Sequence, residues 1–462
     1  MTKFELQPTY ENVLDTFEKD ILNRNIDVLR FTELLNSFED SVSIALDSQW
    51  GSGKTFFVKQ VKLVLDAFNA HVDHPNAKDK ERICEIWGRI KTSSKPDLQP
   101  QISVYYDAWE NDNDEDPILS LIYLILQSAS VNFSFSKTPG FLKIASSIAE
   151  AMSGKSVVAI HDALQKEDPM EHIRTAKNLQ EQIAKFLDSL LAERGNRLVI
   201  FVDELDRCNP AFAVKLLERI KHYFSNDRIT FVFSVNIAEL QHTIRKHYGD
   251  EFNATRYLDR FFDLRIDLPP AKMEHLYDII GLNGDYTYEE VCKAIIKQNH
   301  FSLREIFKFQ RMAKAAAYEP MHNDAQYDFT FPSGGATYFC LMFLVPIMIG
   351  LKISDHSRYD AFVTGKDSSP LCEFFLTTTV GTRIRNSLLA DNEYFDTEEP
   401  SHKSIPVKIE DKLGKLYNAL FIQQYSSHIY EVRIGKMSFN NQSRDVLLRA
   451  VSTLSNYSNY SI

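Results

Sequence analysis

A run of small residues ends in a lysine and a hydroxyl side chain, in the segment Ser48-Gln49-Trp50-Gly51-Ser52-Gly53-Lys54-Thr55. Glycines lack Cβ, and backbone N–H groups at the start of a helix form a cradle for anions. Lys54 would then reach the β- and γ-phosphates of a nucleotide, and Thr55 would ligate Mg²⁺. The usual pattern, GxxxxGK[ST], has glycine where this sequence has Ser48. The alternative is a glycine-rich turn with an incidental lysine.

A second candidate site is the apolar run LVIFVD, residues 198–203, which delivers Asp203 and Glu204 at its end. Open α/β sheets bind ligands at the carboxyl ends of their strands. Asp203 would hold Mg²⁺ through water, and Glu204 would act as the general base for an attacking water. The alternative is an acidic turn that merely ends a strand. The phosphate loop and this acidic pair, each after a strand, together predict nucleotide hydrolysis.

Asn236 and three arginines are further candidates. Asn236 follows the run ITFVFSV and would orient the attacking water, or cap the next helix, or do both. Arg256, Arg260 and Arg304 would stabilise charge on the phosphoryl group, from the same chain or a neighbouring one. Surface ion pairing is the alternative for each arginine.

Five apolar runs position these residues, at 41–47, 102–106, 198–203, 229–235 and 264–268. Helical patterns lie between the runs. Apolar strands that alternate with helices predict a parallel sheet covered on both faces. Beyond Pro270 the strand pattern fades, and residues 271–315 and 336–390 are expected to be helical.

Composition narrows the class of protein. The 63 acidic and 52 basic residues give a net charge of −11, which argues against attraction of the whole molecule to nucleic acid or anionic lipid. Five scattered cysteines without a CxxC pair indicate reduced thiols in a cytoplasmic protein. The first residues show no signal peptide. The apolar segment 336–351 is expected to be a buried core helix, with membrane contact as the alternative.

Four stretches resemble the KAP family of P-loop NTPases: LDSQWGSGKT (46–55), YYDAWENDNDEDP (105–117), VDELDRCNP (202–210) and YLDRFFDLRIDLPP (257–270). A weaker match, residues 20–24, brings Arg24 towards the nucleotide base. The resemblance implies an α/β core of the additional-strand, catalytic-glutamate type, with strand order 5-1-4-3-2. The nucleotide-binding residues would be Ser48, Gln49, Trp50, Gly51, Ser52, Gly53, Lys54, Thr55, Phe56 and Arg24.

The same resemblance divides the chain into a core at 1–270 with a helical insertion at 131–175, a helical lid region at 271–390 and an accessory region at 391–462. It implies ATP and Mg²⁺ as cofactors, a protein partner that is an effector or is encoded in the same operon, and a possible homo-oligomer. Bacterial members are associated with anti-phage defence. Two functions stay open: an ATPase that acts as a switch or remodelling motor, and a nucleotide-gated interaction module with slow or no hydrolysis. A role for nucleic acid is left open.

Overall fold

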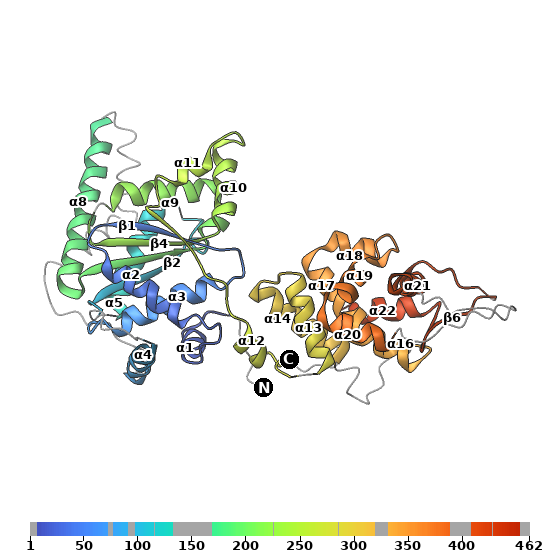
Figure 1. Ribbon diagram of the computed structural model, residues 1–462. Coiled ribbons are helices and arrows are strands. Elements are labelled where there is room, and N and C mark those ends of the chain that lie inside the picture. The colour runs from blue at the N-terminus through green and yellow to red at the C-terminus, as the bar shows by residue number, and fades with distance from the viewer. Residues whose placement is uncertain are drawn as a thin grey trace. The chain divides into compact units, whose positions relative to one another are not determined.

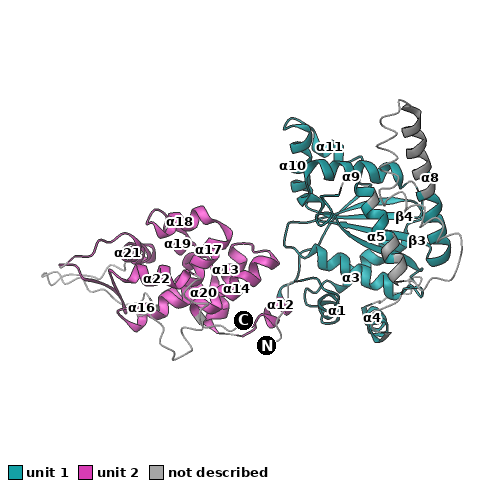
Figure 2. Ribbon diagram, turned by 180° about the vertical axis from the view of Figure 1, so that it is seen from behind, with its two compact units in different colours: residues 1–273 teal, residues 274–462 magenta. Residues whose placement is uncertain are grey.

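The computed structural model describes residues 7–72, 77–90, 98–114, 116–132, 169–224, 226–284, 286–318, 331–388, 408–426 and 428–452. The chain forms two compact units, residues 1–273 and 274–462 (Figure 2). The boundary falls close to the predicted end of the core at residue 270. The predicted insertion at 131–175 lies mostly outside the described residues, as does the predicted boundary at 390, so both stay predictions.

A parallel sheet of five strands forms the middle of unit 1 (Figure 1). The strands are β1 (Val42–Asp47), β2 (Gln101–Asp107), β3 (Arg197–Asp203), β4 (Ile229–Val235) and β5 (Leu264–Asp267). Their order is β2-β3-β4-β1-β5, which is the predicted order read from the other edge. Asp203 is in register with Asp107 on β2 and Ser234 on β4, so Asp107 and Asp203, the last residues of β2 and β3, lie side by side at the carboxyl end of the sheet.

Helices cover both faces of this sheet (Figure 1). One face carries α1 (Tyr10–Glu18), α2 (Asn25–Ser37), α3 (Lys54–Ala67) and α4 (Ala77–Ile90). The other carries α5 (Pro117–Asn132), α8 (Pro169–Arg194), α9 (Pro210–Tyr223), α10 (Ile237–Tyr248) and α11 (Ala254–Leu258). The sheet is therefore the middle layer of three.

Alternate residues of the central strands enter two separate hydrophobic cores. Ile200 and Phe233 pack with α9 and α10, whereas Val199 and Val232 pack with α2 and α3. Every residue of β3 and β4 is buried. Strands covered on both faces read as continuous apolar runs, which is why the sequence showed no alternation there.

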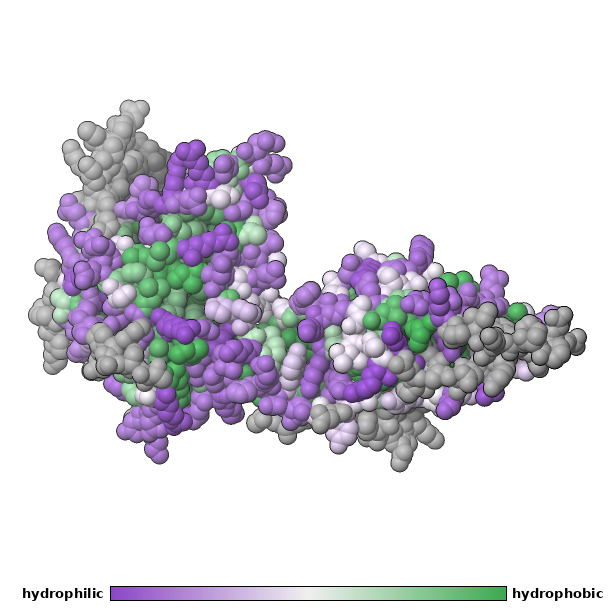
Figure 3. Space-filling model, viewed as in Figure 1, coloured by the Kyte–Doolittle hydropathy of each residue, from purple (hydrophilic) through white to green (hydrophobic). Residues whose placement is uncertain are grey.

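The edge strand β5 differs from the others. Three of its four residues are exposed, and Leu264 keeps 38% of its surface accessible. On the face shown in Figure 3, hydrophobic side chains gather over the zone of the sheet, with hydrophilic ones around them. Within the sheet that the structure describes, β2 and β5 are the two edge strands, and β5 is the more exposed of them.

Unit 2 is mainly helical. Its first helices are α12 (Glu274–Ile279), α13 (Thr287–Gln298), α14 (Leu303–Ala313) and the π-helical turn η2 (Lys314–Tyr318). After them come α16 (Gly334–Phe339), the π-helical turn η3 (Cys340–Leu344), α17 (Val345–Ser354), α18 (His356–Val363), α19 (Ser369–Thr377), α20 (Thr379–Leu388), α21 (Ile409–Phe421) and α22 (Ser443–Val451). Strands β6 (Glu431–Ile434) and β7 (Met437–Asn440) form an antiparallel hairpin before α22.

The segment Gly334–Ser354 is a continuous helical run through α16, η3 and α17. Among the described residues it is the one helix whose length and hydropathy would allow it to cross a membrane. Its most apolar window is 78% buried inside the protein, and Phe339, Phe343 and Met348 are fully buried. This burial is that of the core helix expected from the sequence.

Candidate functional site

The predicted phosphate loop lies between β1 and α3, at the carboxyl edge of the sheet. Gly51 and Gly53 have φ angles of 75° and 90°, in the left-handed region that favours glycine. Ser48 is not among the described residues with positive φ. The first position of the loop therefore needs no left-handed backbone here, and a side chain is accommodated. This is a physical reason why Ser48 can replace the usual glycine.

Lys54 begins α3 and is nearly buried, with 8% of its surface accessible. Its ammonium group donates to the backbone carbonyls of Ser48 and Gln49, the latter at 3.2 Å. Burial lowers the pKa of Lys54, and the carboxylates of Asp206, Asp203, Glu204 and Asp47 oppose that shift. The ammonium group is thus hydrogen-bonded to its own loop and lies close to four carboxylates.

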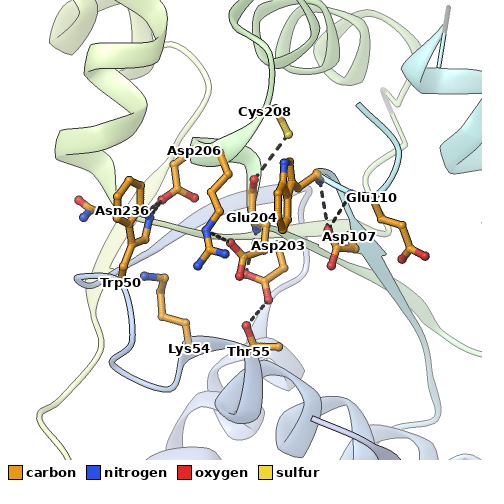
Figure 4. A network of polar contacts seen from close by, with 12 residues as sticks. Trp50, Lys54, Thr55, Asp107, Glu110, Asp203, Glu204, Asp206, Cys208 and Asn236 are labelled. Carbon is orange, nitrogen blue, oxygen red and sulfur yellow. Dashed lines mark hydrogen bonds and ion pairs between the residues drawn. The ribbon is translucent and has the colours of Figure 1, made fainter. Parts of the chain in front are cut away.

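Asp203 joins the phosphate loop to β3. Its Oδ2 accepts a hydrogen bond from Thr55 Oγ1 at 2.7 Å (Figure 4). The same oxygen accepts from Tyr105 Oη at 2.9 Å, and Asp203 is 1% exposed. A carboxylate and a hydroxyl oxygen in contact are ligands that Mg²⁺ prefers, directly or through water. The pair predicted to bind the metal is therefore brought together, and its chemistry fits Mg²⁺.

Glu204 follows Asp203 with a φ angle of 60°, which is uncommon for a residue with a side chain. Burial, with the Asp203 carboxylate beside it, raises the pKa of Glu204 to about 7, while the Arg207 guanidinium acts to lower it. Arg207 Nε forms an ion pair with Glu204 Oε2. A carboxyl group with a pKa near neutrality is suited to take a proton from water.

Asp206 and Asn236 lie beside this group. The Trp50 indole N–H donates to Asp206 Oδ2 at 2.5 Å, and the backbone N–H of Asn236 donates to the same oxygen at 3.2 Å (Figure 4). The side-chain oxygen of Asn236 caps α10 by accepting from the N–H groups of Ala238 and Glu239. The predicted cap is therefore present, and a role in orienting water stays a prediction.

Arg24 is buried with 4% of its surface accessible, and it connects two segments of unit 1. Its terminal nitrogens donate to the carbonyl oxygens of Ser52 at 2.8 Å and Pro269 at 2.6 Å. Arg24 therefore links the phosphate loop to the segment after β5 through hydrogen bonds to main-chain carbonyl groups. The structure shows no more about its predicted place near the nucleotide base.

The three arginines predicted to stabilise phosphoryl charge have exposed side chains. Arg256 lies in α11 and Arg260 just after it, and no ion pair to either is present among the described residues of unit 1. Arg304 lies in the first turn of α14, in unit 2. Among the described residues of unit 1, no hydrogen bond or ion pair joins the side chain of Arg256 or Arg260 to the phosphate loop, and the roles of all three arginines stay predictions.

Four residues at the site had no role assigned from the sequence: Tyr105, Asp206, Arg207 and Trp109. All four lie within the stretches YYDAWENDNDEDP and VDELDRCNP, which resemble the family. That membership was the signal in the sequence that could have pointed to them. The pairings between them depend on which loops meet across three strands. The sequence alone does not state those pairings.

A parallel sheet with a phosphate loop after β1, an acidic pair after β3 and an additional strand, β4, between them defines a P-loop NTPase of the additional-strand, catalytic-glutamate type. The chain belongs to the KAP family: the model of the KAP family P-loop domain matches residues 26–291, more than half of the chain. The protein is therefore a nucleotide-binding P-loop NTPase.

Other similarities are partial or weak. A 62-residue stretch is 42% identical to the uncharacterized protein MJ0182 of Methanocaldococcus jannaschii, and it covers 13% of this chain and 32% of that protein. The structure of the Aeropyrum pernix Orc1 protein in complex with DNA has a TM-score of 0.32 and 13% identity, covering 95% of this chain and 92% of that chain. The structure of C. elegans PCH-2 has a TM-score of 0.21 and 11% identity, covering 68% of this chain and 66% of that chain.

Proposed function

We propose that this protein is a Mg²⁺-dependent ATPase that acts as a switch or remodelling motor for a protein partner. The observation that carries the proposal is the hydrogen bond from Thr55 to Asp203, which unites the phosphate loop and the metal-binding acid beside Glu204. In this proposal Lys54 contacts the β- and γ-phosphates, and Thr55 and Asp203 hold Mg²⁺. Bound Mg²⁺ would neutralise charge on the phosphates.

Glu204 is the general base of the proposed reaction. It is next to Asp203 and partly buried, and a pKa of about 7 leaves a large fraction of it ionised at neutral pH. The carboxylate would take the proton of the attacking water as the oxygen approaches the terminal phosphorus. Hydrolysis then converts the bound nucleotide from a triphosphate to a diphosphate, and that difference would drive a change in the partner.

The first experiment measures nucleotide binding and Mg-ATP turnover by the full chain and by Lys54→Ala. The variant is expected to lose both, because it removes the buried cation that pairs with the phosphates. Lys62→Ala is the matched control, since Lys62 lies on the same helix and pairs with Asp66 at 2.6 Å. Turnover by Lys54→Ala at the parent rate would contradict the proposal.

The alternative is a nucleotide-gated interaction module in which hydrolysis is slow or absent. Glu204→Gln separates the two, because it removes the base and keeps the size of the side chain. A motor should lose about 10²–10⁴-fold in turnover, the range of general base catalysis, and should hold ATP without acting on its partner. A gated module should keep or strengthen its partner binding in the same variant.

The biological setting is also a proposal. The family resemblance supports a role in bacterial anti-phage defence, in the cytoplasm, with an effector or operon-encoded protein as the partner. The exposed Arg256 and Arg260 are compatible with a homo-oligomer in which one copy completes the site of another. Sedimentation of the full chain with and without a non-hydrolysable ATP analogue tests assembly, and an unchanged monomer in both states would contradict it.

A further inference from the structure

Arg207 lies at the end of the short 3₁₀ helix η1 (Leu205–Arg207), directly after the acidic pair of β3. Its Nε forms the ion pair with Glu204 Oε2. The side chain keeps 22% of its surface accessible, so it is neither sealed in the core nor free in solvent. The residue therefore contacts the proposed base with one atom of its guanidinium.

Two tryptophans hold the guanidinium of Arg207. Its Cζ lies 5.8 Å from the ring centre of Trp50 and 5.8 Å from that of Trp109. Trp50 belongs to the phosphate loop and is itself tied to Asp206, while Trp109 follows β2. Arginine over an aromatic face is attracted by the ring electrons, and contacts with two rings restrict its rotation. The guanidinium is thus fixed beside the loop that binds phosphate.

The terminal nitrogens of Arg207 differ from those of Arg24 and Arg197, two buried arginines of unit 1. Arg24 and Arg197 donate their terminal N–H groups to backbone carbonyls. For Arg207, the bonded contact in the described part of the chain is made through Nε. Its terminal N–H groups therefore remain available as donors in a fixed plane, an arrangement that matches phosphoryl oxygens.

We propose that Arg207 binds the terminal phosphate of the nucleotide, as an arginine supplied by the same chain. This inference rests on the proposed nucleotide site and assigns a further residue to it. The contact with Glu204 uses Nε and the contact with phosphate uses the terminal nitrogens, so both hold at once. Arg207 then aligns the base and the phosphoryl group with a single side chain, and it stabilises the charge that grows during transfer.

The decisive experiment compares the affinity of the full chain for Mg-ADP and for a non-hydrolysable ATP analogue with Mg²⁺, by calorimetry. Arg207→Ala is expected to weaken analogue binding by about tenfold or more, as for a lost charge-assisted hydrogen bond, and to change ADP binding by less than about twofold. Arg207→Lys should recover part of the lost analogue affinity, because lysine keeps the positive charge but lacks the paired N–H donors of the guanidinium. Arg228→Ala is the control, since Arg228 precedes β4 and pairs with Asp188 at the opposite edge of the sheet.

A purely supporting role for Arg207 gives a different result. If the arginine acts only through Glu204, then Arg207→Ala placed in a Glu204→Gln background leaves analogue affinity unchanged. We expect the same loss of about tenfold in that background, because the phosphate contact does not pass through the base. Equal weakening of ADP and analogue, or no change in either, would overturn the proposal.

The tryptophans supply a signal independent of turnover. The chain has three, and Trp87 is 4% exposed, packed against Phe68 away from the other two. In a Trp87→Phe background, emission from Trp50 and Trp109 should change more with the analogue than with ADP, and this difference between the two nucleotides should vanish in Arg207→Gln. A parent that binds neither nucleotide would refute the proposed function itself. A parent that binds both, with identical responses in every Arg207 variant, would refute only this inference.

Discussion

Both ends of the parallel sheet bury charged side chains, but the hydrogen bonding of those side chains differs between the two ends. At the amino end, the guanidinium of Arg197 is satisfied: it donates to the carbonyls of Phe38, Asp40 and Asp227 and to Thr230 Oγ1, at 2.8 to 3.3 Å. At the carboxyl end, Lys54 is folded onto its own loop and Glu204 keeps a pKa of about 7. A charge that is fully hydrogen-bonded to the backbone holds the fold together, whereas a cluster of charged groups with shifted pKa values marks a candidate ligand site.

Unit 2 extends the contrast. Its interior is built from aromatic and aliphatic side chains such as Phe343 and Phe375, and Ser438 and Ser443 are its buried polar residues in the described part. Unit 1 buries many polar and charged groups, and those at the carboxyl end of the sheet converge on the phosphate loop. The clustering of charged groups at one end of the sheet, more than the extent of burial, therefore marks the candidate site.

The largest expected effect is at the carboxyl end. Asp203→Ala should lower Mg-ATP turnover by about 10³-fold or more, because the carboxylate positions a metal whose charge stabilisation is worth several kcal/mol. The thermal midpoint should change less, because the loss of hydrogen bonds from Thr55, Tyr105 and the Glu204 backbone N–H is partly offset by relief of the repulsion between the carboxylates of Asp203 and Glu204. Asp188→Ala, at the other edge, is the control. If Asp203→Ala turns over Mg-ATP at the parent rate, the carboxyl end of the sheet is not the catalytic site.

The next largest effect is expected at the amino end of the sheet, where a substitution should change the free energy of unfolding and not nucleotide binding. Arg197→Ala leaves four acceptors without their donor. A fully buried acceptor that loses its partner costs about 1–3 kcal/mol, and three of these four contacts are only partly buried, so the loss should reach about 3 kcal/mol in urea unfolding. Nucleotide affinity of the folded variant should match the parent. Arg197→Lys should restore part of the stability. A change in nucleotide affinity larger than the change in unfolding free energy would contradict the division of roles between the two ends.

A smaller effect concerns pH. Since the pKa of Glu204 is raised from its usual value to about 7, the carboxyl is mostly protonated at pH 6 and cannot accept a proton from water. Turnover should therefore rise about tenfold between pH 6 and pH 8, following the ionised fraction. The residual activity of Glu204→Gln should lack this rise. A parent profile that is flat over this range would indicate another base.

Much of unit 1 could be predicted from the sequence because β3 and β4 are buried at every residue and appear as unbroken apolar runs. The five strands and their order are confirmed. Thr55 and Asp203 are hydrogen-bonded, and their role as the metal ligands stays a prediction. The long-range side-chain pairings could not be predicted in the same way. Arg24 reaches Ser52 and Pro269 across 28 and 245 positions of the chain, and no local pattern encodes such contacts.

Arg207 shows the same limit at the site itself. The sequence offered Arg256, Arg260 and Arg304 as the arginines for phosphoryl charge, because each stands near a strand or helix end. Arg207 stood closer, four residues after Asp203, but its importance depends on two tryptophans from separate loops. Contacts of this kind are fixed by tertiary packing and become visible only in the structure.

The smallest expected effect is at Asn236, a residue that combines a structural contact with a position at the candidate site. Its oxygen caps α10, as a structural group would, although it lies at the functional edge of the sheet. Asn236→Ala should cost about 1 kcal/mol of stability, the usual value of an N-cap. Asn236→Asp keeps a capping oxygen and removes the amide donors, so it should retain stability. If Asn236→Asp also keeps parent turnover, the residue is a cap alone; a fall in turnover with unchanged stability would show that its amide acts on the attacking water.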